Sequence, residues 1–287
     1  MFYRRMKPLR HLLLGLALLG GASSAFAAEL NCAPGATNVE EFRYSWRLRG
    51  GIGWLAGLMF PNRGVGSLKT VFPKAGEHEI SSQLMMTAQE GASGGFYVYE
   101  SQMDQTGSKT LMTYHGYAWG KKARKERTIF DYVKRLARIH RETTERTDDR
   151  VKLFPAEASS ESALRDILTG IYFLREHAAE IKGPITTSIY SDGKHYPVIF
   201  RPADRRTFRM GNQTIAALGF EIVDAPGGKK WPGGVKVWVS DDARRIPFRI
   251  EISESVASMQ LDLQSVESCA FMGQAQSLAS RSVQPAR

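Results

Sequence analysis

The residues best suited to nucleophilic chemistry lie in a glycine-rich run, Gly91-Ala92-Ser93-Gly94-Gly95. This run matches the Gly-x-Ser-x-Gly pattern of hydrolases, in which a sharp turn from a strand into a helix exposes the serine hydroxyl beside backbone amides. Here the next residues, Phe96-Tyr97-Val98-Tyr99, are typical of a strand and not of the required helix. We therefore predict a hairpin turn at residues 91–95.

A second candidate for chemistry is the charged run Asp241-Asp242-Ala243-Arg244-Arg245. Two adjacent carboxylates could transfer protons or bind a metal, but no histidine or further carboxylate stands at metal-ligand spacing beside them. In the interpretation that we favour, Asp241 and Asp242 accept hydrogen bonds within a turn while Arg244 and Arg245 pair with them. The sequence thus predicts no catalytic residue, no metal and no cofactor.

Aromatic side chains suit the binding of an apolar ligand. The run from Phe96 to Tyr99 is apolar or amphipathic on both faces of its strand, and Trp238 stands on the otherwise polar side of another strand. A central strand buried on both faces would explain this pattern. If one face instead lines a groove, the residues in contact with the ligand are Tyr97, Tyr99, Trp238 and Tyr172.

Short segments of alternating polarity, separated by Gly, Pro, Asn or Asp, position these groups. They predict strands over Phe42–Leu48, Ser67–Phe72, Glu79–Ala88, Phe96–Met103, Thr110–Trp119, Ile185–Tyr190 and His195–Phe200. Asp192-Gly193 favours a hairpin between the last two, because both central positions of a type I′ turn need positive φ. The last third of the chain predicts a meander of three strands, each with one buried face, over residues 235–239, 248–252 and 259–263.

One segment follows a helical period instead. Apolar residues recur at helical spacing from Ser160 to Arg175, and Ser159 or Ser160 can cap the start. The segment from Thr128 to Arg141 fits either a helix or a strand. The elements together predict a mainly antiparallel β domain on which one main helix packs.

Two segments together resemble an exported bacterial family known as domain of unknown function 3108. Residues 166–175 resemble the Asp-x-Leu-Ser-x-x-Tyr-x-x-Arg helix of that family, with Thr169-Gly170 in place of Ser and a small residue. Residues 237–247 resemble its most distinctive element, a strand and turn near the C-terminus, and the similarity runs from about Phe42 to Leu263. The matching residues are Asp166, Tyr172, Arg175, Trp238, Ser240, Asp241, Asp242, Arg245 and Pro247.

This resemblance implies a shape. Members of the family are similar in architecture to the periplasmic lipoprotein carriers, in which helix covers the concave side of a strongly curved antiparallel sheet. We therefore predict a mainly β fold with a single curved antiparallel sheet, a half-barrel, and one main packing helix. The resemblance implies an apolar groove but identifies no ligand, because a fold alone does not determine a function.

The first 27 residues are typical of a secretory signal peptide, with basic residues, an apolar run from Leu12 to Leu19 and a cleavage site at Ala25-Phe26-Ala27. We expect an exported, periplasmic protein that is soluble after cleavage. Residues 28–270 would form a single β-rich domain and residues 271–287 a mobile tail. Cys32 and Cys269 stand near the two ends of that domain, and an oxidising compartment favours a disulfide between them, although the sequence does not establish the pairing.

The charge of the chain is concentrated in one region. The net charge of +10 falls to +6 when the four basic residues of the leader are removed. Between Lys121 and Lys152, twelve Lys and Arg stand against six Asp and Glu, an excess that equals the whole remaining surplus. Such a region can face anionic lipid headgroups, nucleic acid or an acidic partner, and the simplest alternative is a solvated face of mixed charge.

Three functional hypotheses follow. The first is a non-enzymatic envelope protein that binds or carries a hydrophobic or lipid-like molecule, with its basic region facing an anionic membrane surface or a partner. The second is a structural or interaction module that binds another envelope protein through its basic region. The third is a hydrolase that uses Ser93 or the Asp241-Asp242 pair. We expect no nucleic acid partner, and the sequence does not determine the oligomeric state.

Overall fold

The structure, a computed structural model, describes a set of chain segments that together form one sheet and one helix. These segments are residues 38–49, 62–74, 76–88, 96–119, 121–154, 164–191, 193–227, 229–231, 233–253 and 258–268. The leader, residues 91–95, both cysteines and the C-terminal tail lie outside them. The signal peptide, the turn at Ser93 and the disulfide therefore stay predictions.

Fifteen strands form the sheet. In chain order they are β1 (Val39–Arg49), β2 (Arg63–Val71), β3 (Glu79–Ala88), β4 (Phe96–Asp104), β5 (Thr110–Trp119), β6 (Lys122–Asp131), β7 (Leu136–Thr143), β8 (Thr147–Leu153), β9 (Leu164–Arg165), β10 (Ile185–Ser191), β11 (Lys194–Met210), β12 (Gln213–Asp224), β13 (Gly234–Ser240), β14 (Pro247–Ser253) and β15 (Ser258–Ser268). Their order across the sheet is β8-β7-β6-β5-β4-β3-β2-β1-β15-β14-β13-β12-β11-β10-β9. Neighbours run antiparallel except for the short β9, which is parallel to β10.

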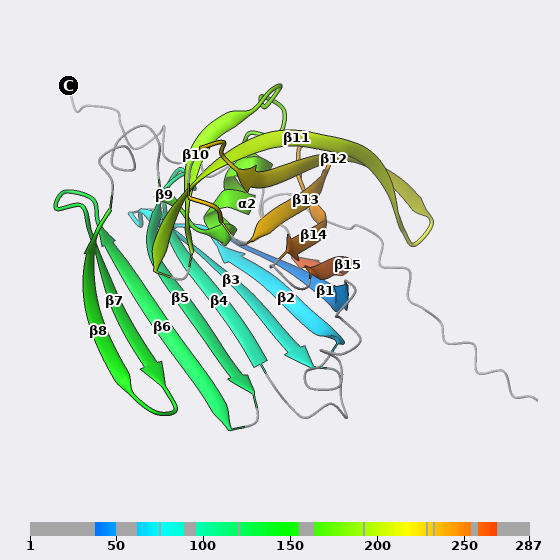
Figure 1. The fold of residues 1–287 in the computed structure, drawn as a ribbon. Coiled ribbons are helices and arrows are strands. Elements are labelled where there is room, and N and C mark those ends of the chain that lie inside the picture. The colour runs from blue at the N-terminus through cyan, green and yellow to red at the C-terminus, as the bar shows by residue number, and fades with distance from the viewer. Residues whose placement is uncertain are drawn as a thin grey trace, which may run out of the picture.

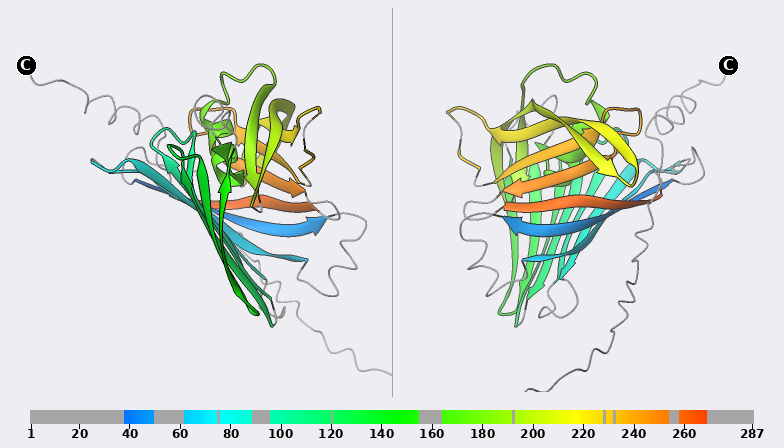
Figure 2. Two further views of the ribbon diagram at one scale, coloured as in Figure 1. Left: turned by 60° about the vertical axis from the view of Figure 1, so that its left-hand side comes forward. Right: turned by 90° about the vertical axis from the view of Figure 1, so that its right-hand side faces the viewer.

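The sheet is strongly curved, and its concave side holds the core. Figures 1 and 2 show β10–β15 bending across β2–β8, with the helix α2 (Ile167–Glu176) between the two parts. Alternation along the strands produces this sidedness: in β3, Ile80, Leu84 and Met86 are buried on the inner face, whereas Met85 between them is exposed. The predicted curved antiparallel sheet with one main packing helix is thereby confirmed.

Helix α2 contacts the sheet closely because it carries a glycine on its packed face. A Cβ atom at Gly170 would lie 3.2–3.4 Å from side chains of Phe200, Ile222 and Ile189. Leu168, Ile171 and Leu174 are buried in the same cluster as these three residues. The small residue thus lets the helix sit near the sheet, and its long apolar side chains fill the space on either side.

The helix begins later than its apolar periodicity predicts. Leu164 and Arg165 pair with β10 as strand β9, and Asp166 is the N-cap, its side chain accepting a hydrogen bond from the amide of Thr169. The expected cap at Ser159 or Ser160, which lie outside the described residues, is therefore wrong. The buried positions of Leu164 and Arg165 satisfy a helical pattern and a strand equally well, so periodicity alone misplaces the start.

Several strands differ from, or extend, the sequence-based expectation. Residues 128–141, which fit either element, belong to the β6–β7 hairpin. The hairpin at Gly193 is confirmed, with the glycine at φ +73°, and the meander of β13, β14 and β15 is confirmed as well. Strand β8, the second half of β11 and the whole of β12 are not among the predicted strands. In β8 and the second half of β11, charged and small polar residues dominate and the apolar alternation is lost.

At the end of the half-barrel nearest α2, side chains of β6 and β8 contact β10 and the turn that follows it. Phe130 of β6 packs edge-on against Tyr190 of β10, with ring centroids 4.8 Å apart, and both belong to a buried cluster that includes Phe154 and Leu164. Lys152 of β8 donates a hydrogen bond to the carbonyl of Gly193 at 2.8 Å. The half-barrel is therefore bridged at the end nearest α2, and its strands continue beyond that bridge toward the other end.

Candidate binding site on the concave face

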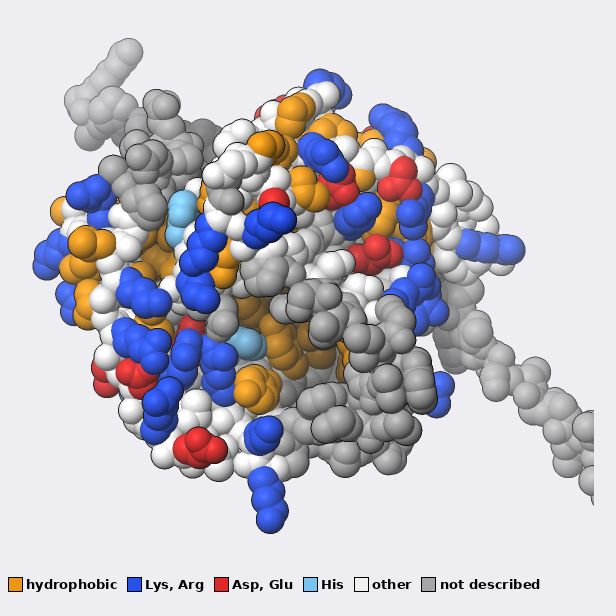
Figure 3. Space-filling view, viewed as in Figure 1, with side chains coloured by type: hydrophobic (Ala, Val, Ile, Leu, Met, Phe, Trp, Pro, Cys, Tyr) orange, Lys and Arg blue, Asp and Glu red, His pale blue; other side chains and the backbone are white. Residues whose placement is uncertain are grey.

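The inner face of β4–β7 changes along the strands from buried to half-buried. Ser101 and Thr128 are fully covered near α2, whereas Tyr97, Tyr117 and Arg124 farther along the same strands are half-buried. Figure 3 shows this side of the molecule hollowed, with hydrophobic side chains on the floor of the hollow and a group of Lys and Arg beside it over β6–β8. We call this surface the open-end site, and its residues are Tyr97, Tyr99, His115, Tyr117, Arg124, Glu126 and Arg141.

Strand register arranges the open-end site in two rows. In the first row, Tyr97 of β4 pairs with Tyr117 of β5, which pairs with Arg124 of β6. In the second row, the order is Tyr99, His115, Glu126 and Arg141. Directly paired residues have neighbouring side chains on one face of a sheet, so each row runs from aromatic to charged groups.

The aromatic part of the site is packed around His115. The imidazole centroid lies 4.9 Å from the ring of Tyr97, 5.9 Å from that of Tyr99 and 6.2 Å from that of Tyr117. Burial raises the pKa of Tyr99 well above its ordinary value, so its hydroxyl is neutral at physiological pH. The three tyrosine rings give β4 and β5 a largely apolar inner surface around the imidazole.

The charged part of the site is built on one buried carboxylate. Glu126 accepts hydrogen bonds from Arg141 Nε at 2.5 Å and from Arg124 Nη2 at 2.7 Å. Its side chain is 7% exposed, while those of the two arginines are 20% exposed. One carboxylate thus orients two guanidinium groups, and these three side chains carry a net charge of +1 at the edge of the aromatic surface.

Only two of the four predicted ligand-binding residues belong to this surface. Tyr97 and Tyr99 are adjacent on β4, but Tyr172 is buried in a separate cluster with Phe72, Ile80 and Met103. Trp238 lies on the outer face of β13, is 1% exposed, and is covered by the guanidinium of Arg206 at 4.3 Å from its ring. The structure therefore separates Tyr172 and Trp238 from the hollow.

The residues that carry the family resemblance form a buried link between α2 and the turn after β13. Arg175 donates two hydrogen bonds to Glu40, at 2.5 and 3.0 Å, and its Nε donates to the carbonyl of Arg245 at 2.9 Å. Arg175 and Glu40 are 1% and 2% exposed. Burial by itself would lower the pKa of Arg175, but the adjacent Glu40 carboxylate raises it above the ordinary value, so the pair is ionised.

The turn that follows β13 is held by its own polar side chains. Ser240 Oγ donates to Asp242 and accepts from the amide of Ile246, each at 2.8 Å. Asp242 also binds Arg244, and Asp241 lies 3.5 Å from Arg245. Pro247, the first residue of β14, stands at a register shift between β13 and β14, where no ladder donor is needed. These contacts match the structural interpretation of the acidic pair.

Asp166 is the least solvated carboxylate of the motif. Besides capping α2, it donates from its amide to Thr110 Oγ1 at 2.9 Å, and Thr110 in turn donates to Thr169 Oγ1 at 2.8 Å. Ser101 contacts the same threonine hydroxyl at 2.9 Å. Burial raises the pKa of Asp166 from 3.8 to about 6, and hydrogen bonds from Thr169 and Ser101 limit the rise. The network joins α2 to β4 and β5.

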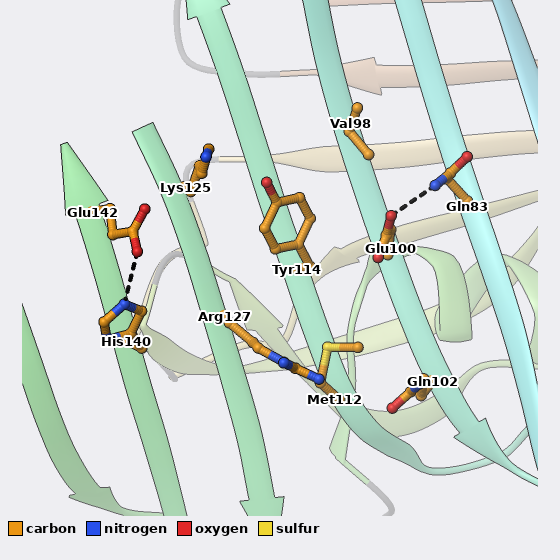
Figure 4. A pocket seen from close by; sticks show the side chains of 10 residues that line it. All are labelled: Gln83, Val98, Glu100, Gln102, Met112, Tyr114, Lys125, Arg127, His140 and Glu142. Atoms are coloured by element: carbon orange, nitrogen blue, oxygen red, sulfur yellow. Dashed lines mark hydrogen bonds and ion pairs between the residues drawn. The ribbon is translucent and has the colours of Figure 1, made fainter. Parts of the chain in front are cut away.

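The outer face of the same strands carries a different, polar pocket. Figure 4 shows this pocket, of about 610 Å³, on the convex side of β3–β7. Glu100 binds Gln83 at 2.7 Å, and His140 binds Glu142 at 3.2 Å and Asp149 at 2.7 Å. Hydrogen bonds to the carboxylate of Asp149, and secondarily to that of Glu142, raise the pKa of His140 because these carboxylates accept from the protonated imidazole. Lys125 and Arg127, from the basic region, complete its wall.

In the parts of the chain that the structure describes, no group of three His, Cys, Asp or Glu side chains could hold a metal ion. Five residues of the open-end site are not singled out by the sequence pattern: His115, Tyr117, Arg124, Glu126 and Arg141. The signal that could have found them is the alternation His-x-Tyr in β5 and Arg-x-Glu in β6, which marks one face of each strand once both segments are recognised as strands.

The fold and the site define a half-barrel whose concave face is partly covered by a helix and carries aromatic and arginine side chains at its open end. The chain belongs to the protein family of unknown function DUF3108, whose family model matches residues 62–264. The comparison with curated proteins gives no match. No helix in the described residues is long and apolar enough to cross a membrane.

Two solved structures are similar to this chain. One is a β-barrel-like protein of domain of unknown function DUF1849 from Brucella abortus, with a TM-score of 0.40, 8% identity, and coverage of 81% of this chain and 98% of that chain. The other is the hypothetical lipoprotein YmcC from Escherichia coli, with a TM-score of 0.31, 11% identity, and coverage of 78% of this chain and 86% of that chain.

Proposed function

We propose that this protein is a non-enzymatic binding protein of the cell envelope that holds a hydrophobic or lipid-like ligand against the open-end site. The observation that carries the proposal is the pair of cross-strand rows, in which half-buried aromatic rings on β4 and β5 continue into two arginines on β6 and β7. Binding sites for small molecules are mostly apolar surfaces with a few oriented polar groups, and this surface has that composition.

The order of side chains along the rows suits an amphiphile with an anionic group. An apolar chain would lie over Tyr97, Tyr99 and Tyr117, where contact removes aromatic surface from water. A carboxylate or phosphate would then lie near Arg124 and Arg141, whose planar guanidinium groups match the geometry of such anions. Glu126 holds both arginines in place, so little side-chain entropy would be lost on binding.

The first test asks whether a ligand is present. The mature protein is purified gently from its own envelope and weighed by native mass spectrometry, and the bound material is then extracted and identified. We expect a lipid or another long-chain amphiphile in one-to-one stoichiometry. Protein that carries no ligand and also takes up none from added long-chain fatty acid would overturn the proposal.

The second test locates the ligand with two probes, a fluorescent long-chain fatty acid and its methyl ester. Tyr117→Ala should weaken the binding of both probes by roughly tenfold, which corresponds to the loss of about 1.4 kcal/mol of apolar contact. The matched control is Tyr114→Ala, which changes the same residue type on the outer face of the same strand. Equal losses in the two variants would place the ligand elsewhere.

The charged end is tested with the same two probes. Wild-type protein should bind the acid more tightly than the ester, and Arg124→Gln should reduce that preference by about fivefold to tenfold because one charge-assisted contact is lost. The ester should bind wild type and Arg124→Gln alike. If both Arg124→Gln and Arg141→Gln still prefer the acid to the same extent as wild type, these arginines do not bind the carboxylate of the probe.

A second candidate function is supported by the outer pocket, where Lys125 and Arg127 stand beside a polar wall. In this case the protein is an interaction module that binds another envelope protein through its basic region. Crosslinking in cells distinguishes the two, since one dominant protein partner, lost in Lys125→Glu/Arg127→Glu but retained in Tyr117→Ala, would favour this function over ligand binding.

A further inference from the structure

Exposed aliphatic side chains gather at one corner of the sheet. In the described residues, six large hydrophobic side chains are exposed, and four of them lie on β6, β8 and the turn between β6 and β7. These four, which we call the aliphatic corner, are Ile129 (47% exposed), Val133 (96%), Val151 (64%) and Leu153 (76%). Single exposed aliphatic residues need no explanation, but a cluster on one surface marks a binding interface.

Register shows that the aliphatic corner is one continuous surface. Ile129 pairs with Arg138 of β7, and Arg138 pairs with Val151 of β8, so these three side chains form a row across the outer face. In the next row, Leu153 pairs with Leu136. Val133 lies in the turn that joins β6 to β7. The surface therefore occupies the end of the strands nearest the closed side of the half-barrel, away from the open-end site.

Basic side chains border the aliphatic corner. Arg138 lies within it, and Lys134 and Arg135 follow Val133 in the turn, all three exposed. Asp131 pairs with Leu136 and is the acidic residue of the second row. Its side chain accepts a hydrogen bond from the backbone amide of Lys134. Figure 3 shows hydrophobic side chains beside Lys and Arg at the left-hand edge of the molecule, over β7 and β8. The corner thus combines an apolar surface with a positive border.

We propose that the aliphatic corner docks on the surface of an anionic lipid membrane. Val133 and Leu153 would enter the interfacial region, and Lys134, Arg135 and Arg138 would contact anionic headgroups. A second copy of the chain is a poorer occupant, because two such corners face to face would bring like charges together. This inference is independent of the proposed ligand, since it uses no residue of the open-end site.

The test uses flotation of the mature protein with vesicles of phosphatidylcholine alone and of phosphatidylcholine with phosphatidylglycerol. We expect binding to the anionic vesicles and roughly tenfold weaker binding for Val133→Ser/Leu153→Ser. The matched control is Val65→Ser/Met85→Ser, which removes the other two exposed hydrophobic residues, on β2 and β3, and should bind like wild type. Circular dichroism confirms that each variant is folded.

Charge variants and the oligomeric state, measured by native mass spectrometry, complete the test. Lys134→Gln/Arg138→Gln should weaken binding severalfold and reduce its sensitivity to salt, because fewer charges are screened. Equal binding by wild type and Val133→Ser/Leu153→Ser would overturn the proposal, and so would an equal loss in Val65→Ser/Met85→Ser. A dimer that dissociates in Val133→Ser/Leu153→Ser, without any vesicle binding, would also overturn it and would identify a second copy as the occupant.

Discussion

Two buried carboxylates on the same inner face, Glu40 and Glu126, are neutralised in different ways. Glu40 lies beneath α2 and is held by one arginine, Arg175, through two hydrogen bonds and almost without solvent. Glu126 lies at the open end and accepts hydrogen bonds from two partly exposed arginines, Arg124 and Arg141. The charges of Glu40 and Arg175 cancel, whereas Glu126 and its two arginines together have a net charge of +1.

Under the proposed function, this difference divides the sheet into a sealed part that is structural and an open part that binds the ligand. Arg175 and Arg245, two residues of the family resemblance, meet in the sealed part and join the helix, strand β1 and the turn after β13. The half-buried rings and arginines gather in the open part. Substitutions in the sealed part should therefore change stability, and substitutions in the open part should change binding with little effect on stability.

The largest expected effect is that of Glu40→Gln. It leaves the buried guanidinium of Arg175 without a countercharge, and we expect the free energy of unfolding to fall by about 3–5 kcal/mol in urea titrations. The matched control is Glu41→Gln, the next residue, which pairs with the half-exposed Arg43 and should cost less than about 1 kcal/mol. Similar losses in the two variants would contradict the sealed character of the inner face.

Asp166→Asn should show an effect that depends on pH. Burial in the folded state raises the pKa of Asp166 from 3.8 to about 6, so the folded protein binds this proton more tightly than the unfolded chain does. The contribution of Asp166 to the stability of wild type therefore falls as the pH rises from about 4 to about 6. Asparagine caps a helix equally well and does not ionise. The stability of Asp166→Asn relative to wild type should therefore increase by up to about 3 kcal/mol from pH about 4 to about 7.

This prediction is checked by urea unfolding of both proteins across the pH window. Other carboxylates titrate in both proteins alike, so the difference between the two isolates Asp166. A difference that stays constant with pH would show that Asp166 is not desolvated in the folded protein.

Ser240→Ala tests the turn that receives Arg175. The fully buried hydroxyl accepts from the amide of Ile246, and its removal leaves that amide without its partner, at a cost of about 2 kcal/mol. Ser265→Ala removes an exposed serine hydroxyl on β15 and should change stability by no more than about 0.5 kcal/mol. Thermal unfolding of both variants measures the contrast, and equal stability would mean that the turn is not held by Ser240.

The smallest effect on stability should be that of Arg124→Gln. Glu126 keeps Arg141 as its partner, so the free energy of unfolding should fall by less than about 1 kcal/mol even though binding of an anionic amphiphile weakens. A loss comparable to that of Glu40→Gln would show that the two carboxylates are equivalent and that the open end is structural.

Most strands could be predicted from the sequence because each buries one face, and the alternation of Ile80, Leu84 and Met86 records that face directly. The start of α2 could not, since Leu164 and Arg165 are buried by pairing with β10, a contact with residues more than twenty positions away. Strand β8 escaped prediction because a polar edge strand has little apolar alternation.

The candidate site could be predicted only in part. Tyr97 and Tyr99 stand out because both are aromatic and lie close together in one strand. Trp238 stands out as an aromatic residue on the polar side of its strand, but it lies on the outer face under Arg206. Arg124 and Arg141 were visible only as part of a general basic region. Which basic side chains face inward depends on register, and a shift of one residue would exchange the two faces.

The sequence by itself determined that this chain forms a mainly β protein with one packing helix, since the spacing of apolar residues and the position of turn residues are local properties. Tertiary structure alone decided which end of the concave face is sealed. That outcome depends on where Gly170 lets α2 approach the sheet and on the pairing of Arg175 with Glu40, 135 positions apart. Contacts over such distances follow from the curvature and register of the whole sheet and leave no local signal.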